Sequence, residues 1–130
     1  MAWDLLFYYG MNDILLCSSD PIFIKNLYGI LREDGYRVDI AGHASMAVRM
    51  VFEKSFAAVI LDSDAVGMSS GEAARIILRV ISGIPVILAG ESLLPEGAFS
   101  ISKPLDLEEV LEVLRTVRLI HFPERSVSGL

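Results

Sequence analysis

Cysteine is nearly missing from this sequence, since Cys17 is the only one among 130 residues. A single thiol excludes an internal disulfide framework and a metal site made of several thiolates. It also favours a reducing compartment, so we expect a cytoplasmic protein. The two histidines, His43 and His121, are far apart and have no acidic residues at ligand spacing, which argues against a histidine metal site.

Basic residues and long apolar runs are scarce as well. The 11 Lys and Arg are outnumbered by 17 Asp and Glu, which gives a formal net charge of -6. Nucleic-acid binding needs a basic stripe, so we expect none. A membrane span needs about twenty apolar residues, whereas the longest such run, residues 76–89, is interrupted by Arg79, Gly83 and Pro85.

Signatures of nucleotide binding and of covalent catalysis are absent from the sequence too. No P-loop and no G-x-G-x-x-G motif follows the first predicted strand. There is no serine elbow, and Cys17 has no histidine in a plausible position to act as its base. Because no nucleophile–base pair is present, we do not expect an enzyme that turns over a substrate.

What the sequence does contain suits one globular domain, because 53% of its residues are apolar and 22% are charged. We expect this domain over residues 12–120. Residues 1–11 form an apolar leader rich in aromatic residues, either an upstream start or an arm that docks on this molecule or on a neighbour. Residues 121–130 lose the apolar pattern and are expected to form a flexible C-terminal tail.

Short apolar runs alternate with segments of helical periodicity along the chain. Strands are predicted over residues 14–17, 36–40, 57–61, 85–88 and 99–102. Helices are predicted from Pro21 to the residue before Gly35, over 44–54, from the Ser69–Glu72 capping box to Ile81, and from Asp106 through Val117. Phe52 and Leu107 are assigned to inward-facing positions of their helices.

Strict alternation of strands and helices predicts an α/β fold, with a doubly wound parallel sheet and helices on both of its faces. The connection between the last two strands, residues 90–98, holds Pro95 and two glycines. It has room for barely one helical turn, so one covering helix is predicted to be shortened or missing.

Ligands of open parallel sheets bind beyond the carboxyl ends of the strands. The residues predicted at those ends are Ser18, Ser19 and Asp20 after the first strand, Asp62 after the third, Ala89 and Gly90 after the fourth, and Lys103 after the fifth. Two acids and a lysine therefore converge at one edge of the predicted sheet, and this edge is the candidate site.

Over about residues 12–119 the sequence resembles the receiver domain of two-component response regulators. The segments that carry the resemblance are residues 14–21, 31–38, 58–62, Gly67-Met68, 85–88, Gly97-Ala98 and Ser102-Lys103-Pro104. The resemblance implies a flavodoxin-like, CheY-like fold with five parallel strands in the order 2-1-3-4-5.

In that family an aspartate, matched here by Asp62, accepts a phosphoryl group from a histidine kinase. Beside it a pair of acids holds Mg²⁺, a Ser or Thr contacts the phosphoryl oxygens, and a lysine, matched by Lys103, steadies the charge. This sequence departs from the pattern, because the acid pair aligns with Ser18 and Ser19. The hydroxyl position falls on Ala89 or Gly90, so the phosphoryl contacts are reduced to Gly90 and Lys103.

Two neutral hydroxyls are poor substitutes for carboxylates as Mg²⁺ ligands. Without the metal, a phosphoryl group beside Asp62 meets a repulsion of about 4 kcal/mol for each pair of unit charges roughly 4 Å apart. We therefore expect weak or no phosphorylation and no cofactor. The hypothesis is that Asp62 and Lys103 form a standing ion pair that fixes one conformation, in a degenerate acidic pocket made of Ser18, Ser19 and Asp20.

The sequence is thus interpreted as a stand-alone, atypical receiver in phosphorelay signalling that contacts a signalling protein, such as a histidine kinase or an output protein. One open alternative is a working phosphoacceptor at Asp62, with Mg²⁺ held by Asp20 and Asp62. Another is a small-ligand-binding pseudo-receiver that uses the space left by the missing helix. The surplus apolar residues Val113, Leu119, Ile120 and Phe122, together with the leader, indicate either a homodimer or partner interface or packing within the molecule.

Overall fold

Five strands form one parallel sheet in the computed structural model, which describes residues 12–63, 67–91 and 93–121. The strands are β1 (Asp13–Cys17), β2 (Arg37–Ala41), β3 (Ala58–Asp62), β4 (Val86–Ala89) and β5 (Phe99–Ile101). Their order in the sheet is β2-β1-β3-β4-β5, which confirms the predicted arrangement. The predicted leader, residues 1–11, and residues 122–130 of the predicted tail lie outside the described residues.

The central strands are buried on both faces, as their continuous apolar sequences predict. Every residue of β1 and of β3 is buried, and their register places Leu15 opposite Val59. β2 has only one fully buried residue, Ala41, and lies at an edge of the sheet. The carboxyl ends of β1 and β3 therefore lie side by side in the middle of the domain.

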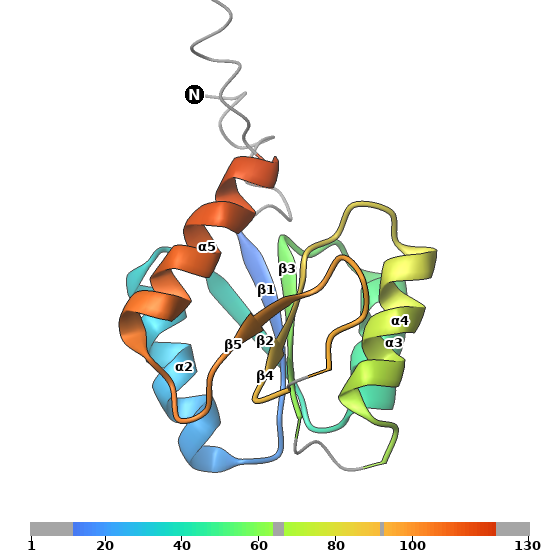
Figure 1. The fold of residues 1–130 in the computed structure, drawn as a ribbon, viewed down its shortest axis with the longest axis horizontal. Coiled ribbons are helices and arrows are strands. Elements are labelled where there is room, and N and C mark those ends of the chain that lie inside the picture. The colour runs from blue at the N-terminus through green and yellow to red at the C-terminus, as the bar shows by residue number, and fades with distance from the viewer. Residues whose placement is uncertain (1–11, 64–66, 92, 122–130) are drawn as a thin grey trace, which may run out of the picture.

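Two helices cover each face of the sheet (Figure 1). α2 (Pro21–Glu33) and α5 (Leu107–His121) lie on one face, and α3 (Ala44–Glu53) and α4 (Ser70–Val80) lie on the other. Local sequence signals define the helix starts: Asp20 caps α2, and the predicted capping box of Ser69 and Glu72 begins α4. Among the described residues, no helix is long and apolar enough to cross a lipid bilayer.

The connection from β4 to β5 carries no helix in its described residues, 90–91 and 93–98. The missing helix that the sequence predicts is thus confirmed for this part of the chain. Leu93 and Leu94 are exposed in this connection, and Glu91 accepts a hydrogen bond from Ser70 Oγ at 3.3 Å. That bond attaches the connection to the first turn of α4.

Two predictions of inward-facing residues are wrong. Phe52 is 58% exposed and Leu107 is 54% exposed. In α3 the buried positions are Ala44, Ala47 and Val51, so Phe52, one residue further along the chain, falls on the flank of the helix. Leu107 is the first residue of α5 and lies before the stretch of that helix that packs on the sheet.

Candidate functional site at the carboxyl edge of the sheet

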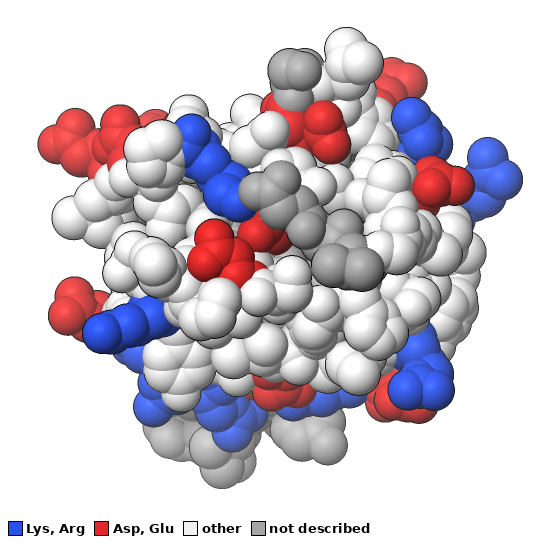
Figure 2. All heavy atoms as spheres, turned by 90° about the horizontal axis from the view of Figure 1, so that it is seen from below, with Lys and Arg blue, Asp and Glu red and all other residues white. Residues whose placement is uncertain are grey.

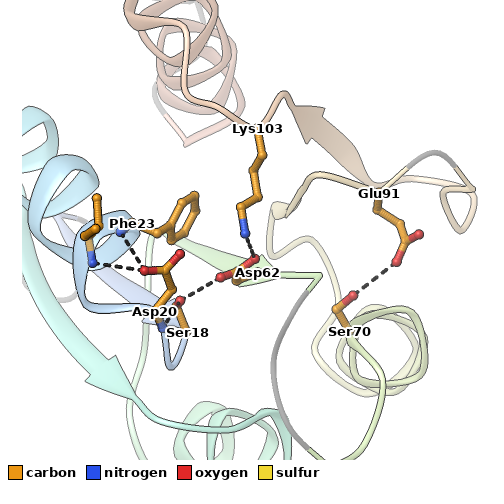
Figure 3. Close-up of polar contacts among 8 residues, drawn as sticks. Ser18, Asp20, Phe23, Asp62, Ser70, Glu91 and Lys103 are labelled. Carbon is orange, nitrogen blue, oxygen red and sulfur yellow. Dashed lines mark hydrogen bonds and ion pairs between the residues drawn. The ribbon is translucent and has the colours of Figure 1, made fainter.

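The candidate site is centred on Asp62, the last residue of β3. Its side chain is 1% exposed, and both carboxylate oxygens accept short hydrogen bonds (Figure 3). Ser18 Oγ donates to Oδ2 at 2.7 Å, and Lys103 Nζ donates to Oδ1 at 2.7 Å. A buried carboxylate without such partners would carry a large desolvation cost. These two contacts therefore stabilise the buried carboxylate of Asp62.

Ser18 follows β1 directly and is itself buried. Its backbone N–H donates to the carbonyl of Ala41, which extends the pairing of β1 with β2 by one residue. Its hydroxyl donates to Asp62 and accepts from the backbone N–H of Asp20 at 3.0 Å. Ser18, which the sequence resemblance matches to one of the paired acids, therefore places a neutral hydroxyl that acts as both donor and acceptor beside Asp62.

The other two residues of the predicted acidic pocket do not join this contact. Ser19 is exposed on the turn between β1 and α2. Asp20 Oδ1 accepts from the backbone N–H groups of Ile22 and Phe23 at 3.0 and 3.4 Å, so Asp20 serves as the N-cap of α2. Of the three residues of the predicted pocket, Ser18 is the one that hydrogen-bonds to Asp62.

Lys103 reaches Asp62 from the chain that follows β5. Its side chain is 19% exposed, and its ammonium lies 4.9 Å from the centroid of the Phe23 ring, within the range of a cation–π contact. Sequence reasoning assigned Phe23 only to the core. Its place beside Lys103 brings α2 together with the segment after β5, which is distant in the sequence, so no local pattern indicates it.

Gly90 leaves space for the Lys103 side chain. A Cβ atom on Gly90 would lie 2.9 Å from Lys103 Cδ and 2.9 Å from Ser63 Oγ, closer than real Cβ contacts allow. Gly90 also has a φ of +77°, a conformation that favours glycine. The space beside Gly90 is therefore filled by the stem of Lys103 and by Ser63, a residue that sequence analysis missed.

Lys103 is the cation that pairs with Asp62. Figure 2 shows this edge of the molecule, where acidic and basic side chains meet near the middle of a face that is otherwise mostly uncharged. The neighbouring thiol of Cys17 is fully buried. Burial, and secondarily the charge of Asp62, raise the pKa of the Cys17 thiol to about 11, so it stays protonated near neutral pH.

Among the residues that the structure describes, the donor set of this site fits a divalent cation poorly. Mg²⁺ prefers an octahedron of oxygen ligands that includes carboxylates. Asp62 is already paired with Lys103, Ser18 carries no charge, and one oxygen of Asp20 is used to cap α2. Within the described residues, no group of three or more His, Cys, Asp or Glu side chains is placed to hold a metal ion.

No protein-family model matches this sequence, and no curated protein matches it as a relative. Solved structures, in contrast, resemble it over most of its length. The signal receiver domain of an HD domain-containing protein from Pseudomonas fluorescens Pf-5 has a TM-score of 0.77 at 23% identity, covering 90% of this chain and 93% of that one. A CheY-like receiver domain from Methanospirillum hungatei JF-1 has a TM-score of 0.75 at 22% identity, covering 85% and 96%.

A third similar structure is the receiver domain of a sensor histidine kinase from Pseudomonas aeruginosa PAO1, which holds a magnesium ion in its active site cleft. Its TM-score is 0.70 at 21% identity, and the match covers 85% of this chain and 97% of that one. These likenesses establish the fold of response regulator receiver domains, as the sequence resemblance predicts. In this chain, the side chains of Ser18 and Lys103 both donate hydrogen bonds to Asp62.

Proposed function

We propose that this chain, which has the fold of response regulator receiver domains, is an atypical receiver that signals by protein–protein contact without phosphorylation. The observation that carries the proposal is the pairing of Asp62 with Ser18 and Lys103 in a buried site. In this arrangement the chain itself neutralises the aspartate that a phosphorylated receiver would use. The protein is then a binding module rather than an enzyme, and it works in the cytoplasm.

Phosphoryl transfer to Asp62 would require one of its oxygens to attack phosphorus while the leaving group departs with its electron pair. Each oxygen already accepts a hydrogen bond, one from Ser18 and one from the Lys103 cation, and these bonds stabilise the negative charge and weaken the oxygens as nucleophiles. The incoming phosphoryl group also brings negative charge to a site where Lys103 already balances Asp62. Both effects raise the barrier to phosphorylation.

The partner of such a module is a signalling protein, such as a histidine kinase or an output protein. Ile22 and Tyr28 are exposed apolar residues on α2, and Ile22 lies just after the turn that carries Ser18 and Asp20. Large apolar side chains exposed on the helix that begins at the site suit a protein–protein contact that does not depend on phosphorylation. A homodimer through the same surface would use the same residues.

The metal-dependent alternative, in which Asp20 and Asp62 hold Mg²⁺ for phosphorylation, is tested by melting temperature. A ligand that binds only the native state raises the melting temperature. We expect Mg²⁺ to leave the wild-type melting temperature unchanged. The variant Ser18→Asp, which puts a second carboxylate against Asp62, should melt at a lower temperature without Mg²⁺ and be stabilised by it.

The control for this experiment is Ser19→Asp, because Ser19 is exposed and does not contact Asp62 in the described structure. It should respond to Mg²⁺ no more than the wild type does. A saturable increase in the wild-type melting temperature that disappears in Asp62→Asn would contradict the proposal and favour the phosphoacceptor.

A further inference from the structure

A groove of about 810 Å³ lies at the amino edge of the sheet, opposite the Asp62 site. Its walls come from the starts of β1 and β2, the end of α3 and the loop between α4 and β4. Phe56 and Ile84 are buried in its floor, while Phe52 is largely exposed on its wall. Exposed apolar surface in a concave site of this size is typical of a binding surface.

The rim of this groove carries an ionic network with one open position. The buried carboxylate of Asp13 accepts from Arg37 Nε at 2.9 Å and lies 3.2 Å from Lys54 Nζ. Lys54 also donates to Asp39 at 2.8 Å. The terminal nitrogens of Arg37 have no hydrogen bond within the described part of the chain, and this side chain is 63% exposed. They present a donor pair suited to a carboxylate.

We propose that the chain's own leader, residues 1–11, occupies this groove. The leader joins the domain at Asn12, next to Asp13, which lines the groove. Eleven fully extended residues span roughly 36–40 Å, so the leader is long enough to lie along the groove. A short tether of this kind gives an effective concentration on the order of millimolar, so even a weak contact is formed within one molecule.

The chemistry of the leader matches that of the groove. Its apolar side chains, which suit the floor and the Phe52 wall, are Met1, Ala2, Trp3, Leu5, Leu6, Phe7, Tyr8, Tyr9 and Met11. Its one charged side chain is Asp4, which complements the open nitrogens of Arg37. The segment after α5, residues 122–130, has fewer large apolar residues and carries both signs of charge. The leader is therefore the occupant that this groove favours.

The fluorescence of Trp3 reports on the surroundings of the leader, because Trp3 is the only tryptophan in the sequence. Indole fluorescence moves to shorter wavelength when the ring leaves water. We expect Trp3 in the folded full chain to emit at shorter wavelength than in a synthetic peptide of residues 1–11. Phe52→Glu should move the emission of the folded chain toward that of the peptide, because it removes the apolar wall.

Leu107→Glu is the matched control, since Leu107 is similarly exposed but lies at the start of α5. It should leave the emission unchanged. Phe7→Glu is a second test variant that alters the leader and not the domain, and it should act like Phe52→Glu. Peptide-like emission in the native wild type, or a short-wavelength emission that persists in Phe52→Glu, would overturn the proposal. So would emission that depends on protein concentration, which would indicate the leader of a second copy.

Discussion

The carboxylate of Asp62 is bonded to a neutral hydroxyl and to a cation, and this combination determines the chemistry of the carboxyl edge. Its side chain is almost wholly excluded from water, where charge interactions are stronger than at the surface. Removing one member of a buried ion pair leaves an uncompensated charge in the interior, which strongly destabilises the folded protein. Replacing both members with neutral groups costs much less stability. The contribution of each side chain is therefore best measured by removing one partner and then both.

Lys103→Met is expected to destabilise the protein by about 3 kcal/mol, because it leaves Asp62 buried without its cation. The double variant Asp62→Asn/Lys103→Met should recover a large part of this loss, since no charge is then left unpaired. Urea unfolding of the wild type, both single variants and the double variant measures the coupling. Equal stability of wild type and Lys103→Met would rule out a standing ion pair.

Cys17 gives a pH-dependent prediction. Its pKa is raised from 9.0 to about 11 in the folded state, mainly by burial, so the unfolded chain loses this proton first as pH rises. The stability linked to Cys17 is therefore fully present below pH 9 and is lost between pH 9 and about 11. Urea unfolding across this range should show a smaller loss of stability for Cys17→Ala than for the wild type. Parallel curves for the two proteins would refute the assignment.

At the scale of elements, the connection after β4 determines whether Lys103 can reach Asp62. Gly90 is the first residue of this connection and donates its backbone N–H to the carbonyl of Ile101 at 2.9 Å. The turn therefore holds the end of β4 against β5, and because Gly90 has no Cβ its backbone can pass close to the lysine stem. A side chain at this position would compete with Lys103 for the same space.

Gly90→Ala is expected to lower the free energy of unfolding by more than about 1 kcal/mol, because alanine is strained at positive φ and its Cβ meets Lys103 and Ser63. Gly29→Ala is the matched control. Gly29 lies inside α2 with open space around it, so alanine there should stabilise the helix by roughly 0.5–1 kcal/mol. Thermal or urea unfolding of both variants measures the contrast, and two shifts of the same sign would contradict it.

Local signals in the sequence predict the elements well and the site only in part. Asp20 before Pro21 and the Ser69–Glu72 box define helix starts through contacts within three residues, so the sequence indicates them directly. The meeting of Ser18 with Asp62 follows from adjacent parallel strands. The positions of Phe23 and Ser63 beside Lys103 depend on packing between distant segments, which periodicity does not encode.

At the scale of the whole molecule, two edges of one sheet have different chemistry. The carboxyl edge holds the paired Asp62, and the amino edge holds the groove with its exposed Phe52. Parallel topology places the strand ends of each kind together, so the alternating pattern of the sequence predicts the carboxyl-edge site. The sequence did not predict the groove, because Phe52 was assigned to the core. The exposure of Phe52 becomes apparent only from the way α3 packs on the sheet.

The central claim is that Asp62 is paired within the chain and is not phosphorylated. Intact-mass spectrometry tests this claim most directly. The folded wild type and Asp62→Asn are incubated side by side with a small phosphodonor and Mg²⁺. We predict no phosphoryl-sized mass gain in either protein. A gain in the wild type that is absent from Asp62→Asn would contradict the account and identify a working phosphoacceptor.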